Sequence, residues 1–307
     1  MFGYLRFILA NIVLLSHTGL SPEWGNIGAT SVTIFYMLSG FVITNILNKF
    51  SQKKERIIDN FYIDRVLRIF PLYIIILILY STYLLKFDLN FSIISFLQNL
   101  ILIPCNYIKD PIIPVSWSLA LEFQMFIIMP FLHKNRVLFY MLGFISMVIF
   151  FMSNLSYLDK YSWGYYKLPG VIFIFLTGSI IAKSKKNIIE ICLPISISVI
   201  SFVGLLLIEL GFIERGGFQS EVLLGTSLGV PLIMLLKGSK KLMYNSELGS
   251  MSYSIFLIHY LFIFILKGCN LNYLSYNLLI FSLSLFFSIM IYYLIEQRIT
   301  NWRLNLN

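Results

Sequence analysis

Long runs of apolar residues alternate with short polar segments along the whole chain. Runs of about 17–22 residues are long enough to cross the hydrocarbon core of a bilayer as α-helices. Such runs cover residues 5–21, 28–48, 67–85, 116–132, 136–153, 167–182, 189–209, 219–236, 250–267 and 274–295. The pattern therefore predicts an all-α fold, a polytopic membrane helical bundle of about ten transmembrane helices.

One further apolar run, FSIISFLQNLILIPC at residues 91–105, is short for a transmembrane helix. Lysine and arginine are enriched in cytoplasmic loops. With ten helices and a cytoplasmic N-terminus, seventeen Lys and Arg lie inside and six outside, whereas an eleventh helix would leave twelve inside and eleven outside. The charge bias therefore predicts that both termini are cytoplasmic. The same bias predicts that residues 91–105 form a re-entrant or surface helix within an outer loop of residues 86–115.

The composition agrees with a chain that lies almost wholly in the membrane. Hydrophobic residues make up 58% of the 307 residues and charged residues 12%, which is outside the range of soluble domains. The net charge of +9 is explained by loop charges that set orientation, so we expect membrane lipids and no nucleic acid as partners. We expect a single integral-membrane domain over residues 1–307, with no appended soluble domain.

Two polar side chains interrupt the first apolar run. Arg6 and His17 are eleven residues apart, which on a helix is three turns plus about 20° and a rise of about 16 Å. Both therefore lie on one face, with Ala10 and Val13 between them. A charge in an apolar helix costs at least about 2.5–3.5 kcal/mol, so such residues usually face protein or water and indicate function.

Four more residues fall near the middle or outer middle of the predicted helices. Ser39 and Gly40 lie near mid-depth, Glu122 about 9 Å below the outer edge, and His259 about 13 Å above the inner edge. A Ser-Gly pair is also typical of a close helix contact, and His259 is also compatible with a buried histidine bonded to a neighbouring helix. Glu122 points more strongly to function, because a lone carboxylate in hydrocarbon must be protonated, paired or hydrated.

The inner loop 49–68 is the densest basic segment of the chain. Arg65 and Arg68 lie one turn apart just before Pro71, and together with Arg6 they would line an inner pocket for a phosphate-rich ligand. The same cations would also serve to enforce topology or to hold anionic lipid. The scattered histidines and cysteines show no metal-ligand spacing, so no metal is expected.

These motifs together resemble the acyltransferase type 3 family, bacterial integral-membrane enzymes that O-acetylate O-antigens and exopolysaccharides. The family's Arg-x10-His signature is matched by Arg6 and His17, and its aromatic SG stretch by FYMLSG at 35–40, with Tyr36 replacing a Phe. The other matches are RVLRIFP at 65–71, WSLALEFQ at 117–124, LGSMSYSIFLIHY at 248–260 and LIEQRITNW at 294–302, which includes Glu296.

The resemblance implies an enzyme of the bacterial cytoplasmic membrane that moves an acetyl group from cytoplasmic acetyl-CoA to a polysaccharide hydroxyl. Acetyl-CoA would be the donor substrate, and no permanently bound cofactor is expected. The implied roles are general base for His17, orientation of that base or sugar binding for Glu122, and coenzyme phosphate binding for Arg6, Arg65 and Arg68. The acyl path or substrate site would be lined by Ser39, Gly40, Trp117 and His259, with Gly40 leaving room for the thioester.

Two points stay open in the sequence. Direct transfer and an acyl-histidine intermediate are both compatible with these residues. The rival function is a lipid-linked sugar transporter or flippase that uses Glu122 and the histidines as a proton relay. A sugar polymerase is less favoured, because most of the predicted outer loops are short.

Overall fold

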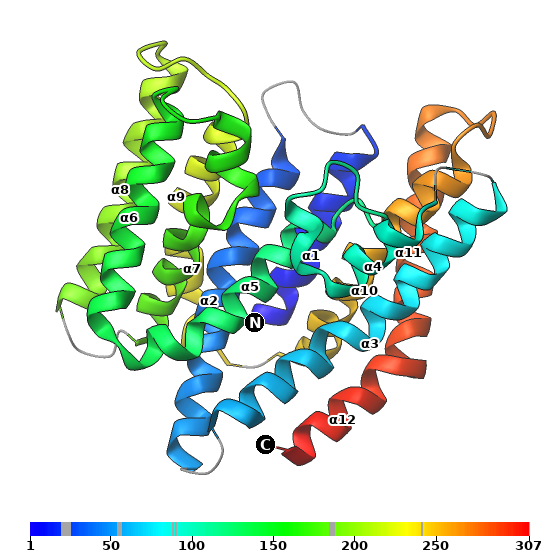
Figure 1. Ribbon diagram of the computed structural model, residues 1–307, viewed down its shortest axis with the longest axis horizontal. Helices are drawn as coiled ribbons and strands as arrows, with labels where there is room; N and C mark the ends of the chain where they lie inside the picture. The colour runs from blue at the N-terminus through cyan, green and yellow to red at the C-terminus, as the bar shows by residue number, and fades with distance from the viewer. Residues whose placement is uncertain are drawn as a thin grey trace. The chain divides into compact units, whose positions relative to one another are not determined.

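The computed structural model describes residues 1–19, 26–53, 57–87, 89, 91–183, 188–240 and 242–306. The regular secondary structure of this part of the chain is entirely helical, which confirms the predicted all-α fold (Figure 1). The α-helices are α1 Phe2–His17, α2 Ile27–Lys53, α3 Ile57–Lys86, α4 Ile93–Ile101, α5 Ser116–Lys134, α6 Arg136–Asn154, α7 Leu168–Lys183, α8 Ile188–Glu209, α9 Gln219–Leu236, α10 Asn245–Leu266, α11 Tyr273–Ile291 and α12 Gln297–Leu306. A short 3₁₀ helix, η1 Ile103–Asn106, and two π-helical turns, η2 Ser162–Tyr166 and η3 Tyr292–Glu296, complete the elements.

All ten predicted spans coincide with helices. Among the described residues, eight helical segments are long and apolar enough to cross a membrane, which confirms a polytopic helical bundle. The two other predicted spans fall on α1, which has 16 residues, and on α5, which carries Glu122 and Gln124 near its middle. The span predicted at 5–21 is too long at its end, because Gly19 adopts a left-handed φ of +85° directly after the C-cap residue Thr18.

The apolar run at 91–105 does not form a transmembrane helix. Helix α4 has nine residues, about 14 Å of rise, and therefore cannot cross the hydrocarbon core. The loop around it is built on Asn99, whose side-chain oxygen accepts a hydrogen bond from the Ile112 amide at 3.0 Å. The Tyr73 hydroxyl donates to the Asn99 carbonyl at 2.9 Å. The outer loop predicted at 86–115 thus has a defined interior.

The described helices fall into two compact units. The first unit comprises Met1–Pro22, Tyr62–Ala120 and Lys240–Asn307, and the second comprises Glu23–Phe61 and Leu121–Ser239. Within each unit, segments far apart in the sequence pack together. The expectation of a single functional domain stays a prediction.

In the first unit α1 packs against α10, and α10 packs against α11. Gly3 permits the closest approach, since a Cβ at this position would lie 1.6 Å from the Asn245 carbonyl oxygen. Tyrosine hydroxyls join α3 to α10: Tyr80 donates to the Leu257 carbonyl at 3.2 Å and Tyr83 to the Phe264 carbonyl at 2.8 Å. Polar groups at membrane depth need such partners, because lipid offers none.

In the second unit α2 packs against both α7 and α9, and α7 also packs against α6 and α8. Two glycines set the α2–α7 distance. A Cβ at Gly40 would lie 1.8 Å from the Phe175 carbonyl oxygen, and a Cβ at Gly178 would lie 1.8 Å from the Met37 carbonyl oxygen. Small residues at a helix interface let two backbones approach closely, which is how helices commonly associate in lipid.

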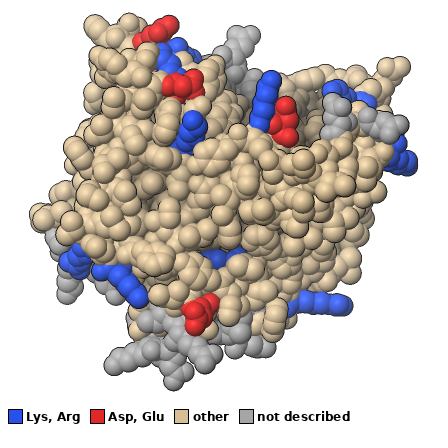
Figure 2. Space-filling model, viewed as in Figure 1, with Lys and Arg blue, Asp and Glu red and all other residues tan. Residues whose placement is uncertain are grey.

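Few charged side chains reach the middle of the surface shown in Figure 2. On the face shown in Figure 2, most Lys, Arg, Asp and Glu gather near helix ends, and uncharged side chains cover the surface between them. This distribution is expected for helices whose middle parts contact hydrocarbon.

Candidate active site

Two histidines from distant parts of the sequence meet in the first unit. His17 is the last residue of α1, and His259 lies in the outer half of α10 as the predicted topology orients it. Their ring centroids are 5.4 Å apart. The structure therefore brings together two of the residues that the sequence singled out, because α1 packs along α10.

Both imidazoles have the same tautomer. His17 Nδ1 lies 3.3 Å from the Val13 carbonyl oxygen, and His259 Nδ1 lies 3.0 Å from the Ile255 carbonyl oxygen. A carbonyl oxygen only accepts hydrogen bonds, so Nδ1 carries the proton in each ring and Nε2 has a free lone pair. His259 is fully buried and its Nε2 has no hydrogen-bond partner among the described residues, whereas His17 is partly exposed. Of the two, His17 is the imidazole that a substrate can reach.

Tyr260 completes this cluster. Its ring centroid lies 4.7 Å from that of His17 and 5.0 Å from that of His259. The sequence analysis did not select Tyr260, although it follows His259 directly in the motif LIHY. The Tyr260 ring contacts the His17 ring because α1 packs on α10. No local pattern in the sequence predicts this contact.

The stripe of α1 that joins Arg6 to His17 faces protein. Ala10 is 0% exposed and Val13 is 1% exposed, and Arg6 is half-buried. The helix is continuous from Phe2 to His17, so the guanidinium and imidazole positions are separated by about 16 Å along one face. This is the arrangement that the eleven-residue spacing predicts.

Arg65 is buried and paired with its neighbour in the sequence. Its Nε donates to the Asp64 carboxylate at 2.9 Å, its Nη2 makes a second bond to the same oxygen, and Asp64 is also buried. The sequence analysis did not consider Asp64 as a partner for this cation. A coenzyme phosphate at Arg65 would share the guanidinium with this carboxylate.

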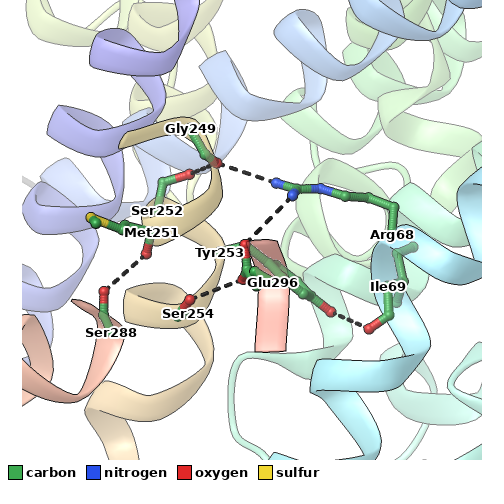
Figure 3. Close-up of polar contacts among 9 residues, drawn as sticks. All are labelled: Arg68, Ile69, Gly249, Met251, Ser252, Tyr253, Ser254, Ser288 and Glu296. Carbon is green, nitrogen blue, oxygen red and sulfur yellow. Dashed lines mark hydrogen bonds and ion pairs between the residues drawn. The ribbon is translucent and has the colours of Figure 1, made fainter. Parts of the chain in front are cut away.

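Arg68 on α3 contacts residues of α10 and of the π-helical turn η3 (Figure 3). Its Nη1 lies 3.8 Å from a Glu296 carboxylate oxygen, and its Nη2 donates to the Gly249 carbonyl at 3.2 Å. The guanidinium also lies over the Tyr253 ring, 5.5 Å from the centroid. Tyr253 in turn donates to the Ile69 carbonyl at 2.9 Å.

Glu296 reaches this position because of the π-helical turn η3. The turn ends at Glu296, whose side chain is buried and accepts a hydrogen bond from Ser254 at 3.0 Å (Figure 3). Single π-helical turns often occur at functional sites because they redirect a side chain. Glu296 is part of the motif LIEQRITNW, but its pairing with Arg68 was not predicted.

Ser39 and Glu122 form the polar pair of the second unit. Ser39 Oγ donates to Glu122 Oε1 at 2.6 Å, and Ser39 is buried while Glu122 is half-buried. The structure therefore supplies the partner that a membrane carboxylate requires, from a residue that the sequence had already selected.

Gly40 is a correction to the sequence analysis. The space beside this glycine was predicted to admit the thioester, but the Phe175 carbonyl oxygen occupies it, and Ser179 Oγ donates to the Gly40 carbonyl at 3.1 Å. The physical reason is the close α2–α7 contact, which uses the missing side chain for backbone packing. The second interpretation of the Ser-Gly pair, a close contact between helices, is the one that fits Gly40.

Tyr36 was quoted only as a motif variant, yet it lies close to the Ser39–Glu122 pair. Its ring stacks on Phe175 with centroids 4.7 Å apart, and it lies within electrostatic reach of Glu122. The hydroxyl is buried and has no hydrogen-bond partner among the described residues. An unpartnered buried hydroxyl next to a carboxylate is a polar group that a substrate can satisfy.

The predicted site residues therefore divide between the two units. The first unit holds Arg6, His17, Arg65, Arg68, Trp117 and His259, and the second holds Ser39, Gly40 and Glu122. Trp117 lies in the first turn of α5 and is partly exposed. Its role at a substrate site stays a prediction.

Comparison with known proteins gives two matches to the sequence. The sequence model of the acyltransferase type 3 family, described as "Acyltransferase domain", matches residues 2–296. An uncharacterized protein of Aquifex aeolicus (strain VF5) is 35% identical over 200 residues, which are 63% of this chain and 90% of the relative. No solved structure matches the chain. The family match includes all the helices that hold the two histidines, the arginine–glutamate pair and the Ser39–Glu122 pair. The chain therefore belongs to the acyltransferase type 3 family and is a multi-pass membrane acyltransferase.

Proposed function

We propose that this membrane acyltransferase moves an acetyl group from cytoplasmic acetyl-CoA to a sugar hydroxyl of a cell-surface polysaccharide. It would act in the bacterial cytoplasmic membrane, with His17 as the general base. The family membership supports acyl transfer over the transport of a lipid-linked sugar. The identities of the acyl donor, the acceptor and the general base are the parts of this function that we propose.

The contact between His17 Nδ1 and the Val13 carbonyl oxygen is the observation that carries the proposal. Because Nδ1 is bonded to the Val13 carbonyl, the ring is fixed in orientation and Nε2 can accept a proton. General base catalysis by a positioned side chain typically contributes about 10²–10⁴-fold in rate. The buried ring of His259 and the ring of Tyr260 hold His17 from one side.

The proposed step balances without a further reactant. His17 Nε2 removes the proton of the sugar hydroxyl, and the oxygen attacks the thioester carbonyl carbon. The carbon–sulfur bond then breaks, and the coenzyme leaves as a thiolate that receives the proton from His17. In the acyl-histidine variant, Nε2 attacks the thioester carbon first, the carbon–sulfur bond breaks and the coenzyme leaves as a thiolate. The sugar oxygen then attacks the acyl carbon, the carbon–nitrogen bond to the ring breaks, and the thiolate takes the proton of the sugar hydroxyl.

Arginine side chains at the base of the first unit would hold the donor. Arg6 begins the stripe that leads to His17, and the pantetheine arm would run alongside this stripe. Asp64 and Glu296 orient Arg65 and Arg68, but each guanidinium has five N–H donors. Guanidinium groups suit bidentate contact with phosphate oxygens, so these arginines would bind the coenzyme phosphates beside their carboxylate partners.

The Ser39–Glu122 pair and Tyr36 would serve the acceptor. A sugar hydroxyl can donate to the carboxylate of Glu122 and accept from the hydroxyl of Tyr36, which has no partner among the described residues. In this role Glu122 would bind the sugar of the acceptor. Trp117 and His259 would border the acyl path, and Ser39 would fix the carboxylate.

Mass spectrometry of surface polysaccharide tests the proposal. Cells that express the gene should carry acetyl groups that a deletion strain lacks, and ¹³C-labelled acetyl-CoA supplied to permeabilised cells should place the label in those groups. Polysaccharide that changes in amount or length, with unchanged acetylation, would contradict the proposed acceptor and support transport or polymerisation. Acetylation without incorporation of the label would contradict the proposed donor.

A further inference from the structure

A lateral groove opens on the second unit where α6 and α8 pack beside α7. It has a volume of about 170 Å³. The one threonine in its wall is satisfied internally, since Thr177 Oγ1 donates to the Phe173 carbonyl at 2.7 Å. The lining is otherwise almost wholly apolar and includes Phe139, Gly143, Phe144, Met147, Leu176 and Ile180.

The groove belongs to a surface that contacts hydrocarbon. Phe144 on α6 is 69% exposed and Val199 on α8 is 55% exposed, and both helices are apolar enough to cross a membrane. A hollow in such a surface loses dispersion contacts unless lipid fills it. From Phe139 to Met147 the groove follows α6 over about 12 Å, which suits an extended acyl chain.

Two cations flank one end of this groove. Arg136 begins α6, one turn before Phe139, and Lys183 ends α7, one turn after Ile180. Lys183 Nζ lies over the Phe139 ring, 4.3 Å from its centroid. The Lys183 ammonium group is thus in direct contact with Phe139, a residue of the groove wall.

The charges at this end favour an anion. Arg136 and Lys183 are close enough to repel each other, and Glu190 is the acidic group that acts on Lys183. Burial and the neighbouring Lys183 lower the pKa of His133, so this histidine is neutral at pH 7 and adds no charge. A bound phosphate would relieve the repulsion between the two cations.

We propose that this groove binds an anionic phospholipid, with the phosphate between Arg136 and Lys183 and one acyl chain along α6. Basic pockets between transmembrane helices are a recurring site for anionic lipid head groups. Gly143 lies in the same wall, and a Cβ added there would make an ordinary contact of 3.4 Å with Leu176 Cδ1.

Native mass spectrometry of the purified full chain tests the site. Phosphatidylglycerol and phosphatidylcholine with identical acyl chains are titrated separately into the detergent-solubilised protein. We expect phosphatidylglycerol to bind at least about fivefold more tightly, since each cation near an anionic head group favours binding by a factor of this order. Equal binding of the two lipids would overturn the proposal.

Matched variants test whether the preference for phosphatidylglycerol arises from the two cations at the groove. Arg136→Gln with Lys183→Gln should remove the preference for phosphatidylglycerol. Lys49→Gln with Arg298→Gln removes the same total charge from exposed positions and should keep it. Retention of the preference in the first double variant, or its loss in the second, would contradict the site.

A second variant tests the acyl chain independently of charge. Gly143→Leu places a side chain in the groove without a backbone clash and should weaken the binding of both lipids at least about fivefold, with an unchanged unfolding temperature. Unchanged binding of both lipids would exclude the groove. Tighter binding of a polyisoprenyl phosphate than of phosphatidylglycerol would show that an isoprenoid, and not a phospholipid, occupies the groove. A protein dimer that Gly143→Leu dissociates would show that a second copy of the chain occupies it.

Discussion

At the scale of single residues, the site depends on how polar groups find partners where lipid offers none. His17 and His259 each donate to a carbonyl of their own helix, Ser39 donates to Glu122, and Arg68 forms an ion pair with Glu296. Each bond fixes a side chain in one orientation, which is what catalysis by positioned groups requires. The functional proposal rests on Nε2 of His17, the ring nitrogen that the hydrogen bond from Nδ1 to the Val13 carbonyl leaves unprotonated.

Replacement of His17 by asparagine separates the base from the structural hydrogen bond. The asparagine amide can still donate toward the Val13 carbonyl, but no nitrogen remains to accept a proton. We expect His17→Asn to lower kcat at least about 100-fold, with unchanged membrane insertion and unfolding temperature. His133→Asn, a change at the end of α5, is the control and should keep full activity.

Arg6 has a different predicted effect. Arg6→Ala should raise the KM for acetyl-CoA about tenfold or more, because a charge-assisted hydrogen bond contributes about 1.5–3 kcal/mol, while kcat changes little. The measurement is a donor titration at saturating acceptor. An unchanged KM for acetyl-CoA would remove Arg6 from donor binding.

Residue spacing predicts contacts along one helix but not between helices. The common stripe of Arg6 and His17 follows from helical periodicity. The meeting of His17 with His259 and Tyr260 depends on the packing of α1 against α10, more than 240 residues apart in sequence, for which the sequence holds no local signal. Gly40 is a position where the sequence alone allows two interpretations, because a glycine can leave an open space or permit a close contact between helices.

At the scale of elements, the length of each apolar run predicts a helix and its neighbours decide where it ends. The ten predicted spans all fall on helices, and the nine residues of α4 explain why 91–105 does not span. The left-handed Gly19 ends α1 earlier than the apolar run suggests. The π-helical turn η3 was not predicted, because the apolar pattern continues through it.

The α2–α7 contact gives a prediction at this scale. Gly40→Ala and Gly178→Ala each add a methyl group where a backbone oxygen lies 1.8 Å away, so we expect each to lower the unfolding free energy by about 1–3 kcal/mol. Gly143→Ala adds the same group where the nearest atom lies 3.4 Å away and should be close to neutral. Thermal unfolding in detergent measures the difference, and equal effects of all three changes would contradict the helix contact.

At the scale of the whole molecule, the distribution of charge predicts the orientation in the membrane. Seventeen Lys and Arg fall on the expected cytoplasmic side and six on the other. This orientation places the arginines near the coenzyme pool and the outer end of α1 near a surface polysaccharide. The native cysteines are suitable reporters, since Cys269 and Cys192 are exposed and Cys105 is buried.

A membrane-impermeant maleimide tests the orientation without new cysteines. Cys269 follows α10 in a loop that the topology places outside, so intact cells should label this residue, and Cys269→Ser should abolish the labelling. Cys192 lies near the inner end of α8 on the lipid-facing surface and should not react in intact cells. Labelling of Cys269 only after lysis would reverse the proposed topology.

The most direct test of transfer across the membrane uses sealed, uniformly oriented vesicles. Radiolabelled acetyl-CoA is supplied only on the cytoplasmic side and the polysaccharide acceptor only on the opposite side, with wild type and His17→Asn compared. The account predicts label in the acceptor for wild type and at least about 100-fold less for His17→Asn. Equal labelling by the two proteins, or labelling only when donor and acceptor share a compartment, would contradict it.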